Sequence, residues 1–159
     1  MVLTIGANFA DYQAEHYAAN RDDRLEKARR YKASIPGLAK TLHRSAKSRA
    51  ESRGLAFDIS VLQIEVMLHA GRCQRSGIPF DVRRMSDARK KPFAPSLDRV
   101  DNSRGYVFDN VQLVCNLFNV GKSDHDQTDF IVMCLAVAKM HADDATANAR
   151  LKDLMNARL

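Results

Sequence analysis

Two short apolar segments, joined by a turn-rich loop and followed at once by a helical pattern, constrain the fold of this chain more than any other feature. Residues Ser96–Val100 and Asn110–Cys115 have the length and apolar character of strands. The loop between them, Asp101-Asn-Ser-Arg-Gly-Tyr-Val-Phe-Asp, is rich in residues that favour turns. Asn116–Ser123 then begins a helix. This order predicts a compact strand, strand and helix unit.

Helical patterns precede this unit. Residues from Asn8 to about Ile35 are mostly helix formers, and Pro36-Gly37 is expected to end that segment. A second, basic helix is expected from Leu38 to Arg53, with Gly54 as a favourable residue just past its end. Its apolar positions recur every four residues, so only a thin stripe is expected to pack. These helices are therefore interpreted as an arm rather than as part of a deep core.

Three further segments complete the expected architecture. Ser60-Val-Leu-Gln63 has the form of a capping box ahead of a short buried helix. Residues Arg72–Phe80 indicate a hairpin-like element, and Asp81–Pro95 reads as a loop. Asp126–Leu159 predicts two helices packed behind the site, joined near Asp143-Asp144. The expected fold class is α+β, a mostly helical chain around a small two-stranded core with a basic N-terminal helical arm.

The net charge of +6 is concentrated in the first two-thirds of the 159-residue chain. Residues 20–54 hold eleven Lys and Arg against four acids, whereas residues 123–159 hold four against six. A polyanion suits such a distribution, because Lys and Arg displace the counterions of phosphates. A solvated helix face is the alternative for the basic run taken alone.

Composition argues against membranes and export. The chain is 45% hydrophobic and 28% charged, and no apolar run approaches membrane-spanning length. The first residues have neither the basic nor the apolar region of a signal peptide. Three cysteines, Cys73, Cys115 and Cys134, match no C-x-x-C pair or disulfide framework. We therefore expect a cytoplasmic protein with free thiols and no membrane partner.

The stretch Pro95–Asp124 resembles the ββα-metal core of HNH (His-Me finger) endonucleases. It contains S-L-D-R-[VI]-D-N-S-x-G-Y, then D-N-V-x-L-V-C and N-x-x-K-S-D at fixed distances. In that family a D-H pair ends the first strand, an Asn begins the second, and N-x-x-K-S-D or H-x-x-K lies on the helix. Upstream, the sequence RCQRSGIPF of Arg72–Phe80 looks like the C-x-x-[TS]-G-x-P-F hairpin of one branch. Together the matched pieces cover about a third of the chain, roughly residues 71–124.

The resemblance implies a role for each matching residue. Asp98 and Asn119 correspond to the metal ligands, Asn110 to the Asn that braces the loop, and Lys122 to a helix lysine near backbone phosphate. Carboxylate and amide oxygens suit Mg²⁺ or Mn²⁺, which protein often holds by only one or two ligands. One such cation stabilises charge on both the scissile phosphate and the leaving 3′-oxygen. The resemblance implies metal-dependent hydrolysis of DNA, by nicking or cutting, and we expect the DNA to be double-stranded.

Arg99 departs from the family pattern, because it stands where the histidine that takes a proton from the attacking water is usual. Arginine is a poor general base, since it stays protonated in proteins. Three interpretations stay open: Asp101 or His125 replaces the base, solvent deprotonates a metal-bound water, or the chain binds DNA or RNA without cutting it. We favour an active enzyme of the D-R-[VI]-D branch with an altered base. The planar fork of Arg99 is itself suited to holding the scissile phosphate instead.

A second departure concerns zinc. Ser76 and Phe118 stand where the second cysteine of each zinc-binding C-x-x-C pair is found in many relatives, so no structural zinc is expected. Cys73 and Cys115 are instead expected to be buried as small apolar residues. In the loop, Gly105 is expected to adopt a positive φ angle. Tyr106 and Phe108, which follow it, are expected to pack on the core rather than to stack on bases.

These observations divide the chain into a basic helical arm (1–54), an HNH-like nuclease core (55–125) and C-terminal packing helices (126–159). The expected nucleic-acid contacts are basic residues of the core and the arm: Lys122, Arg104, Arg99, Arg44, Lys47, Arg29 and Arg30. The expected catalytic residues are Asp98, Arg99, Asn110, Asn119 and Asp101. Together with small size and a basic arm, the resemblance to this family branch also suits a phage or mobile-element gene acting in a bacterial host. Oligomeric state and cleavage preference stay open.

Overall fold

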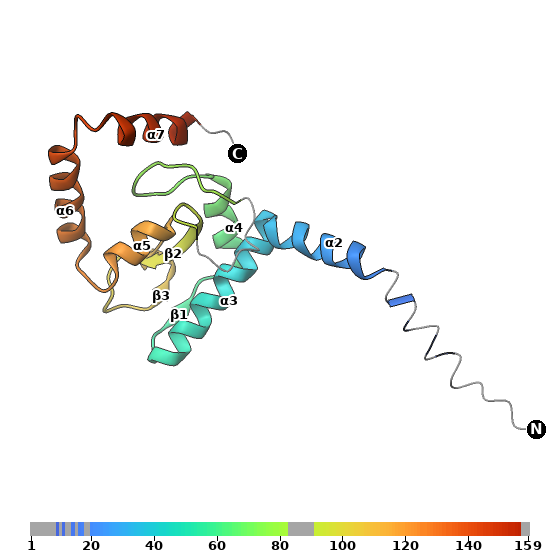
Figure 1. The fold of residues 1–159 in the computed structure, drawn as a ribbon. Coiled ribbons are helices and arrows are strands. Elements are labelled where there is room, and N and C mark those ends of the chain that lie inside the picture. Colours follow the sequence, from blue (N-terminus) through green and yellow to red (C-terminus); the bar gives the residue numbers. More distant parts are fainter. Residues whose placement is uncertain are drawn as a thin grey trace, which may run out of the picture.

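The computed structural model describes residues 20–82 and 91–156, with single positions between 9 and 17. Helices stand at both ends of the described chain, and all of its short strands lie between them (Figure 1). They are α2 (Arg21–Ala33), α3 (Ile35–Arg53), β1 (Phe57–Asp58), α4 (Val61–His69), β2 (Pro95–Arg99), β3 (Tyr106–Val107), the 3₁₀ turn η1 (Phe108–Asn110), β4 (Val111–Cys115), α5 (Asn116–Lys122), α6 (Gln127–Met140) and α7 (Ala145–Asn156). Three expected segments extend outside the described residues. They are the start of the helix expected from residue 8, most of the loop expected over 81–95, and the last three residues of the chain.

Strands β2 and β4 pair in antiparallel register and lead directly into α5. Pro95 faces Cys115 at one end of the ladder, and Arg99 faces Val111 at the other. These elements agree to within about one residue with the strands and helix expected from the sequence. In the described part of the chain, a second short pairing joins β1 to β3 in parallel, with Phe57 opposite Tyr106. The predicted α+β arrangement is therefore present.

Local capping signals define the helices that precede the strands. Ser60 caps α4: its hydroxyl accepts from the Gln63 backbone N–H at 3.2 Å, and the Gln63 side chain accepts from the Ser60 N–H at 2.7 Å. Gly54 ends α3 at φ 64°, as expected. Pro36-Gly37 does not separate two helices as expected, but lies in the first turn of α3 after its Ser34 cap. A first turn tolerates proline because its N–H groups lack helical partners.

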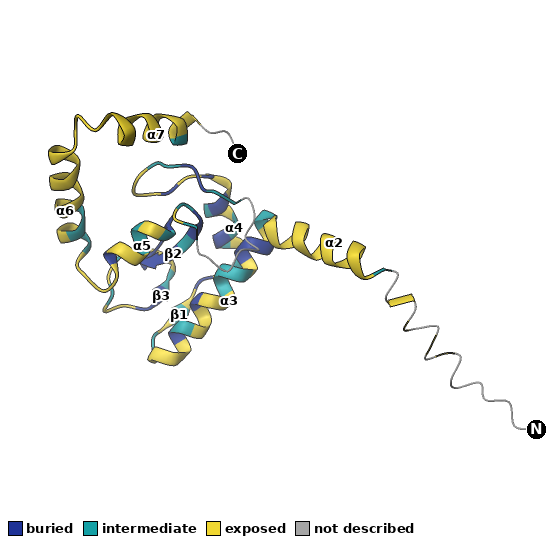
Figure 2. Cartoon of the chain, viewed as in Figure 1, coloured by how far each residue is buried: buried dark blue, intermediate teal, exposed yellow. Residues whose placement is uncertain are grey.

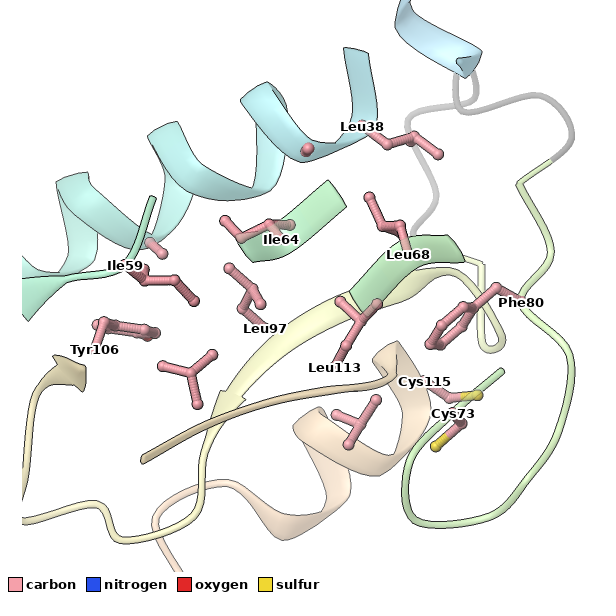
Figure 3. Close-up of a cluster of buried hydrophobic side chains, with 14 of the residues drawn as sticks. Leu38, Ile59, Ile64, Leu68, Cys73, Phe80, Leu97, Tyr106, Leu113 and Cys115 are labelled. Carbon is pink, nitrogen blue, oxygen red and sulfur yellow. The ribbon is translucent and has the colours of Figure 1, made fainter. Parts of the chain in front are cut away.

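The hydrophobic core lies between α3, α4 and the β2–β4 pair (Figure 3). Leu38, Ile64, Leu97 and Leu113 are each no more than 1% exposed. Helix α3 also buries alanines along the same face, so it belongs to the core and the expectation of a two-helix arm does not describe it. Small residues every fourth position allow a close approach of α3 to the strands, which outweighs the thinness of its apolar stripe.

Helix α2 extends away from the core as a solvent-exposed arm (Figures 1 and 2). None of its residues is buried. Ion pairs one turn apart, Lys27 with Asp23 at 2.7 Å and Arg30 with Glu26 at 3.0 Å, line its surface. Such pairs stabilise an exposed helix by a few tenths of a kcal/mol each, about 0.2–0.5. Among the described residues, the basic arm expected from the sequence is thus this helix alone.

Helices α6 and α7 form the outer edge of the molecule and bury none of their residues (Figure 2). The Phe130 ring near the start of α6 packs edge-on against Phe118 of α5, with centroids 5.1 Å apart. Gly121 makes room for this contact, because a Cβ there would lie 3.0 Å from the Phe130 ring. The C-terminal helices were expected to pack behind the site, but α6 is held mainly at its first turns. No helix in the described part of the chain is long and apolar enough to span a membrane.

Candidate active site

A pocket of about 280 Å³ opens where β2, α5 and the end of α3 meet. Its walls carry charged and amide side chains from three separate parts of the sequence. The lining residues are Arg49, Arg53, Leu97, Asp98, Arg99, Asn102, Tyr106, Asn119, Val120, Ser123 and Asp124. Three arginines face two carboxylates, so the formal charge of the wall is positive. Such a pocket favours an anionic ligand, and its carboxylates provide hard oxygen donors.

Asp98 is buried at the end of β2 and has a partner on each carboxylate oxygen. Its Oδ1 lies 3.2 Å from the Lys122 ammonium, and its Oδ2 accepts from Gln112 Nε2 at 2.6 Å. The Asp98 and Lys122 side chains are 3% and 0% exposed, so the ion pair is almost free of water. Removing one partner of such a pair leaves an uncompensated charge in the interior. The pair therefore fixes the carboxylate at the pocket wall.

Lys122 is held by more than Asp98. Its ammonium also donates to the Arg99 carbonyl at 2.9 Å and to Asn102 Oδ1 at 3.4 Å. The sequence led us to expect this lysine near a backbone phosphate. The structure places it beneath the pocket, where its three N–H donors are used and its side chain has no exposed surface. It acts here as an internal tie between α5 and the end of β2.

Gln112 connects the Asp98 carboxylate to two other parts of the fold. Its side chain accepts from Arg75 Nε in the turn after α4, and its Nε2 also donates to Gln127 Oε1 at 2.7 Å. Sequence reasoning did not single out this residue. The available signal was a polar side chain in the apolar strand Val111–Cys115, which needs hydrogen-bond partners if it is buried.

Asn119 projects from α5 to the same pocket as Asp98. Its amide nitrogen donates to Ser96 Oγ at 2.7 Å and to the Leu97 carbonyl at 3.1 Å. These bonds use both N–H groups of the amide and leave its oxygen as the group available for a ligand. The pair expected from the sequence to hold a metal is thus brought to one pocket, by a strand end and the facing helix.

The loop between β2 and β3 is organised by two buried side chains. Asn110 accepts from the Asp101 N–H at 2.9 Å and donates to the Asp101 and Gly105 carbonyls at 2.9 and 3.0 Å. Arg99, only 6% exposed, donates from Nη1 to the Asn102 and Arg104 carbonyls at 2.8 and 3.0 Å. Asn110 therefore holds the loop in place, as expected. Arg99 also borders the pocket, so loop support and ligand contact are compatible for it.

Other expected site residues do not line the pocket. Asp101 is exposed and accepts from the Ser103 hydroxyl at 2.7 Å and N–H at 2.8 Å, which lowers the pKa of its carboxyl. Arg104 pairs with Asp109 at 2.6 Å on the surface. His125, the other base that was considered, is also outside the pocket lining. A lowered pKa makes a carboxylate a weaker base, so position and acidity both count against Asp101.

Arg49 and Arg53 are pocket residues that sequence reasoning did not distinguish from the other cations of α3. Arg49 donates from Nε to the Tyr106 hydroxyl at 3.0 Å, and Arg53 lies 3.9 Å from Asp124. Their spacing could have identified them in the sequence. Each arginine follows a buried alanine, Ala46 or Ala50, by three residues and so lies at the border of the packed face of the helix. The basic residues expected to bind nucleic acid, by contrast, are exposed and outside the pocket lining on α2 and α3: Arg29, Arg30, Arg44 and Lys47.

Gly105 does not have the expected positive φ angle. It is instead a point of close approach, because a Cβ there would lie 2.1 Å from the Ala56 carbonyl oxygen. This approach allows the Tyr106 N–H to donate to Ala56 at 2.8 Å and to join β3 to β1. Tyr106 is buried as expected, at 5% exposure, but Phe108 is 59% exposed and packs on nothing in the core.

Cys73 and Cys115 are buried, as expected, and their sulfur atoms lie together in Figure 3. A hydrogen bond from the Cys115 thiol lowers the pKa of Cys73, and the same contact, together with burial, raises the pKa of Cys115. The Ser76 N–H also donates to Cys73 Sγ at 3.4 Å. Among the described residues, no group of three or more His, Cys, Asp or Glu side chains is placed to hold a metal ion.

Comparison with known proteins places this geometry in context. The HNH restriction endonuclease PacI, described as rare-cutting and as perturbing DNA, superimposes with a TM-score of 0.51 and 20% sequence identity. The match covers 67% of this chain and 80% of the PacI chain. The chain therefore has an HNH-like fold.

Sequence comparison adds one relative. An uncharacterised protein, R423, of Acanthamoeba polyphaga mimivirus is 25% identical over 131 residues, which is 82% of this chain. The chain spans only 23% of the length of that viral protein. No protein-family profile matches the sequence.

Proposed function

We propose that this protein is an HNH-type endonuclease that hydrolyses DNA phosphodiester bonds with the help of one Mg²⁺ or Mn²⁺ ion. One observation carries the proposal: Asp98 and Asn119 line the same pocket as three arginines, at the junction of the β2–β4 pair and α5. Hard oxygen ligands beside cationic side chains are the groups that phosphodiester hydrolysis requires. The HNH-like fold shared with PacI supports the same assignment.

The donor set fits a hard divalent cation. A carboxylate has about four lone-pair sites, and the bonds from Lys122 and Gln112 to Asp98 leave the others for a ligand. The Asn119 amide oxygen is the second donor. When bound, the cation would polarise the phosphate and stabilise the leaving oxygen. Two protein ligands are enough, because Mg²⁺ usually keeps several waters or phosphate oxygens in its octahedron.

The arginines of the pocket have the chemistry to position the substrate. A guanidinium presents paired N–H donors that match two phosphate oxygens. We assign Arg49 and Arg53, together with the exposed edge of Arg99, to the phosphates next to the cleaved bond. The exposed cations of α2 and α3 would then contact the DNA backbone further away, including Arg29, Arg30, Arg44 and Lys47. Double-stranded DNA is the proposed partner, since an extended basic arm follows a duplex backbone over a distance.

The proton acceptor for the attacking water is assigned to Asp124, which takes the place of the bases considered from the sequence. Asp124 lines the pocket, and its side chain is 76% exposed and 3.9 Å from Arg53. Unlike Asp98, it is not committed to a buried ion pair. Replacing it with Asn should lower the cleavage rate at saturating DNA without weakening DNA binding.

Plasmid cleavage tests the function. Supercoiled plasmid incubated with the protein and Mg²⁺ or Mn²⁺ should be nicked or linearised, and EDTA should stop the reaction. Asp98→Asn and Asn119→Ala should each slow cleavage at least about 100-fold, because they remove ligands that stabilise charge in the transition state. Asp153→Asn, an exposed carboxylate change on α7, is the matched control and should cleave at the wild-type rate. Calorimetric titration with Mn²⁺ gives a second readout, with weaker binding to Asp98→Asn than to the control.

A DNA-binding protein without nuclease activity is the second candidate. It is favoured by Arg99 in the position usual for a histidine and by the two partners already held by Asp98. This alternative predicts salt-dependent affinity for DNA with no cleavage in either metal. Absence of cleavage in both metals, with wild-type and Asp98→Asn proteins folded and indistinguishable, would contradict the nuclease proposal and leave this one.

A further inference from the structure

Helix α6 carries an apolar stripe that faces solvent. Val132, Met133, Ala136 and Met140 follow one another at helical spacing and are all exposed, with Met140 at 81%. The helix as a whole has no buried residue (Figure 2). A helix that is apolar over most of its circumference is normally covered. The described part of this chain supplies no element that covers the stripe.

The opposite side of α6 is the one that meets the core. Phe130, on that side, packs against Phe118, and Gln127 accepts a hydrogen bond from Gln112. Phe130 and Ile131 are half-buried, whereas every residue from 132 to 140 is exposed. The apolar stripe therefore points away from the body of the molecule, and a partner can cover it without displacing the core.

The stripe has opposite charges at its two ends, so it is complementary to a second copy of itself that runs in the opposite direction. Asp129 lies in the first turn of α6 and Lys139 in the last, both on the stripe and both exposed. Neither side chain forms an ion pair with another described residue. In an antiparallel pair of identical helices, each Asp129 faces the Lys139 of the other copy, and Val132 faces the small Ala136. Large residues opposite small ones allow close packing.

We propose that α6 is a dimerisation helix that pairs antiparallel with α6 of a second copy of this chain. The contact has twofold symmetry, so each surface is its own complement. Two Asp129–Lys139 pairs flank an apolar centre made by the stripe. A helix of this length measures about 21 Å, which places the interface at the small end of stable contacts. Interfaces of standard size bind in the micromolar range or more tightly, so for this smaller one we expect a dissociation constant on the order of 10 µM.

Charge reversal provides a test that does not depend on nuclease activity. Sedimentation velocity over a range of concentrations should show a monomer–dimer equilibrium for the wild type. Asp129→Lys alone places four lysines at the two contacts, and Lys139→Asp alone places four aspartates there. Each variant should dimerise about 10- to 100-fold more weakly than the wild type, because both attractive contacts become repulsive. Asp153→Lys, on α7, is the matched control and should dimerise like the wild type.

Mixing the two variants tests whether charge pairing along α6 drives the contact. A heterodimer of Asp129→Lys with Lys139→Asp has an opposite charge at both contacts, so an equimolar mixture should recover dimer at concentrations where each variant alone is monomeric. Circular dichroism checks that all variants keep their helix content. The proposal is overturned if the wild type stays monomeric up to about 200 µM, well above the expected dissociation constant. It is also overturned if Asp129→Lys dimerises like Asp153→Lys, or if the mixture recovers no dimer.

Discussion

Two lysines of this molecule lie in opposite environments. Lys122 belongs to the core of strands and helices, and Lys139 belongs to the outer helix α6. Lys122 is completely buried and its ammonium contacts Asp98, the Arg99 carbonyl and Asn102. Lys139 is exposed at the end of a helix in which every residue from 132 to 140, apolar ones included, is exposed as well. Polar side chains are therefore buried in the core, whereas apolar side chains of α6 are exposed to water.

This contrast separates the two tasks that we assign to the molecule. A buried network of Lys122, Asp98 and Gln112 holds the pocket wall in one geometry, because each member would be left unsatisfied by a movement of another. Helix α6 is tied to the core mainly by the Phe130 contact and a Gln127 hydrogen bond. The rigid region is suited to chemistry, and the weakly attached one to association.

Loss of the buried ammonium should have the largest effect on stability. Lys122→Met keeps the length of the side chain but leaves the Asp98 carboxylate buried without its cation, so we expect the free energy of unfolding to fall by about 3–5 kcal/mol. Lys139→Met should change it by no more than about 0.5 kcal/mol. Urea unfolding followed by circular dichroism measures both. Similar changes for the two lysines would show that the core and α6 do not differ as we describe.

Two leucines provide the apolar version of the comparison. Leu113 of β4 is 0% exposed and Leu135 of α6 is 64% exposed. Leu113→Ala should reduce the free energy of unfolding by about 3 kcal/mol, since it removes buried methyl groups and leaves a cavity. Leu135→Ala should reduce it by less than about 0.5 kcal/mol. Thermal denaturation of dilute protein, below the concentration at which dimers form, is the measurement, and a large loss for Leu135→Ala would place α6 in the monomer core.

Helix caps should produce smaller and more local effects. Ser60 caps α4 inside the core, and Asp126 caps α6 by accepting from the Thr128 and Asp129 N–H groups at 2.7 and 3.2 Å. Ser60→Ala should lower global stability by about 1 kcal/mol. Asp126→Ala should leave global stability unchanged and instead reduce protection of the α6 amides in hydrogen exchange. Equal global losses for the two variants would mean that α6 unfolds together with the core.

Acid should affect the same two caps differently. The N–H groups of Asp129 and Thr128 lower the pKa of the Asp126 carboxyl. Its contribution to α6 is therefore present above the ordinary carboxyl pKa and is lost as pH falls through the lower pKa of the folded state. The Ser60 hydroxyl does not titrate. We expect Cα chemical shifts in the first turn of α6 to lose helical character below about pH 4, while those of α4 stay unchanged.

Residues that are neighbours along the chain specify several local features of this protein, and those features could be predicted. The Ser60-x-x-Gln63 capping box, the turn at Gly54 and the two strands followed by α5 were all predicted, because the residues that specify them lie within a few positions of each other. The motif that carries Asp98 and Asn119 was also visible, and the structure brings both to one pocket.

Tertiary structure alone decided which of the charged residues reach that pocket. Arg49 and Arg53 look like the other cations of α3 in sequence, and only the packing of Ala46 and Ala50 on the core places them beside the pocket. Lys122 becomes an internal tie because its partners come from residues 20 to 24 positions away. Burial and partnership between distant residues arise when the elements pack, and a local pattern does not contain that information.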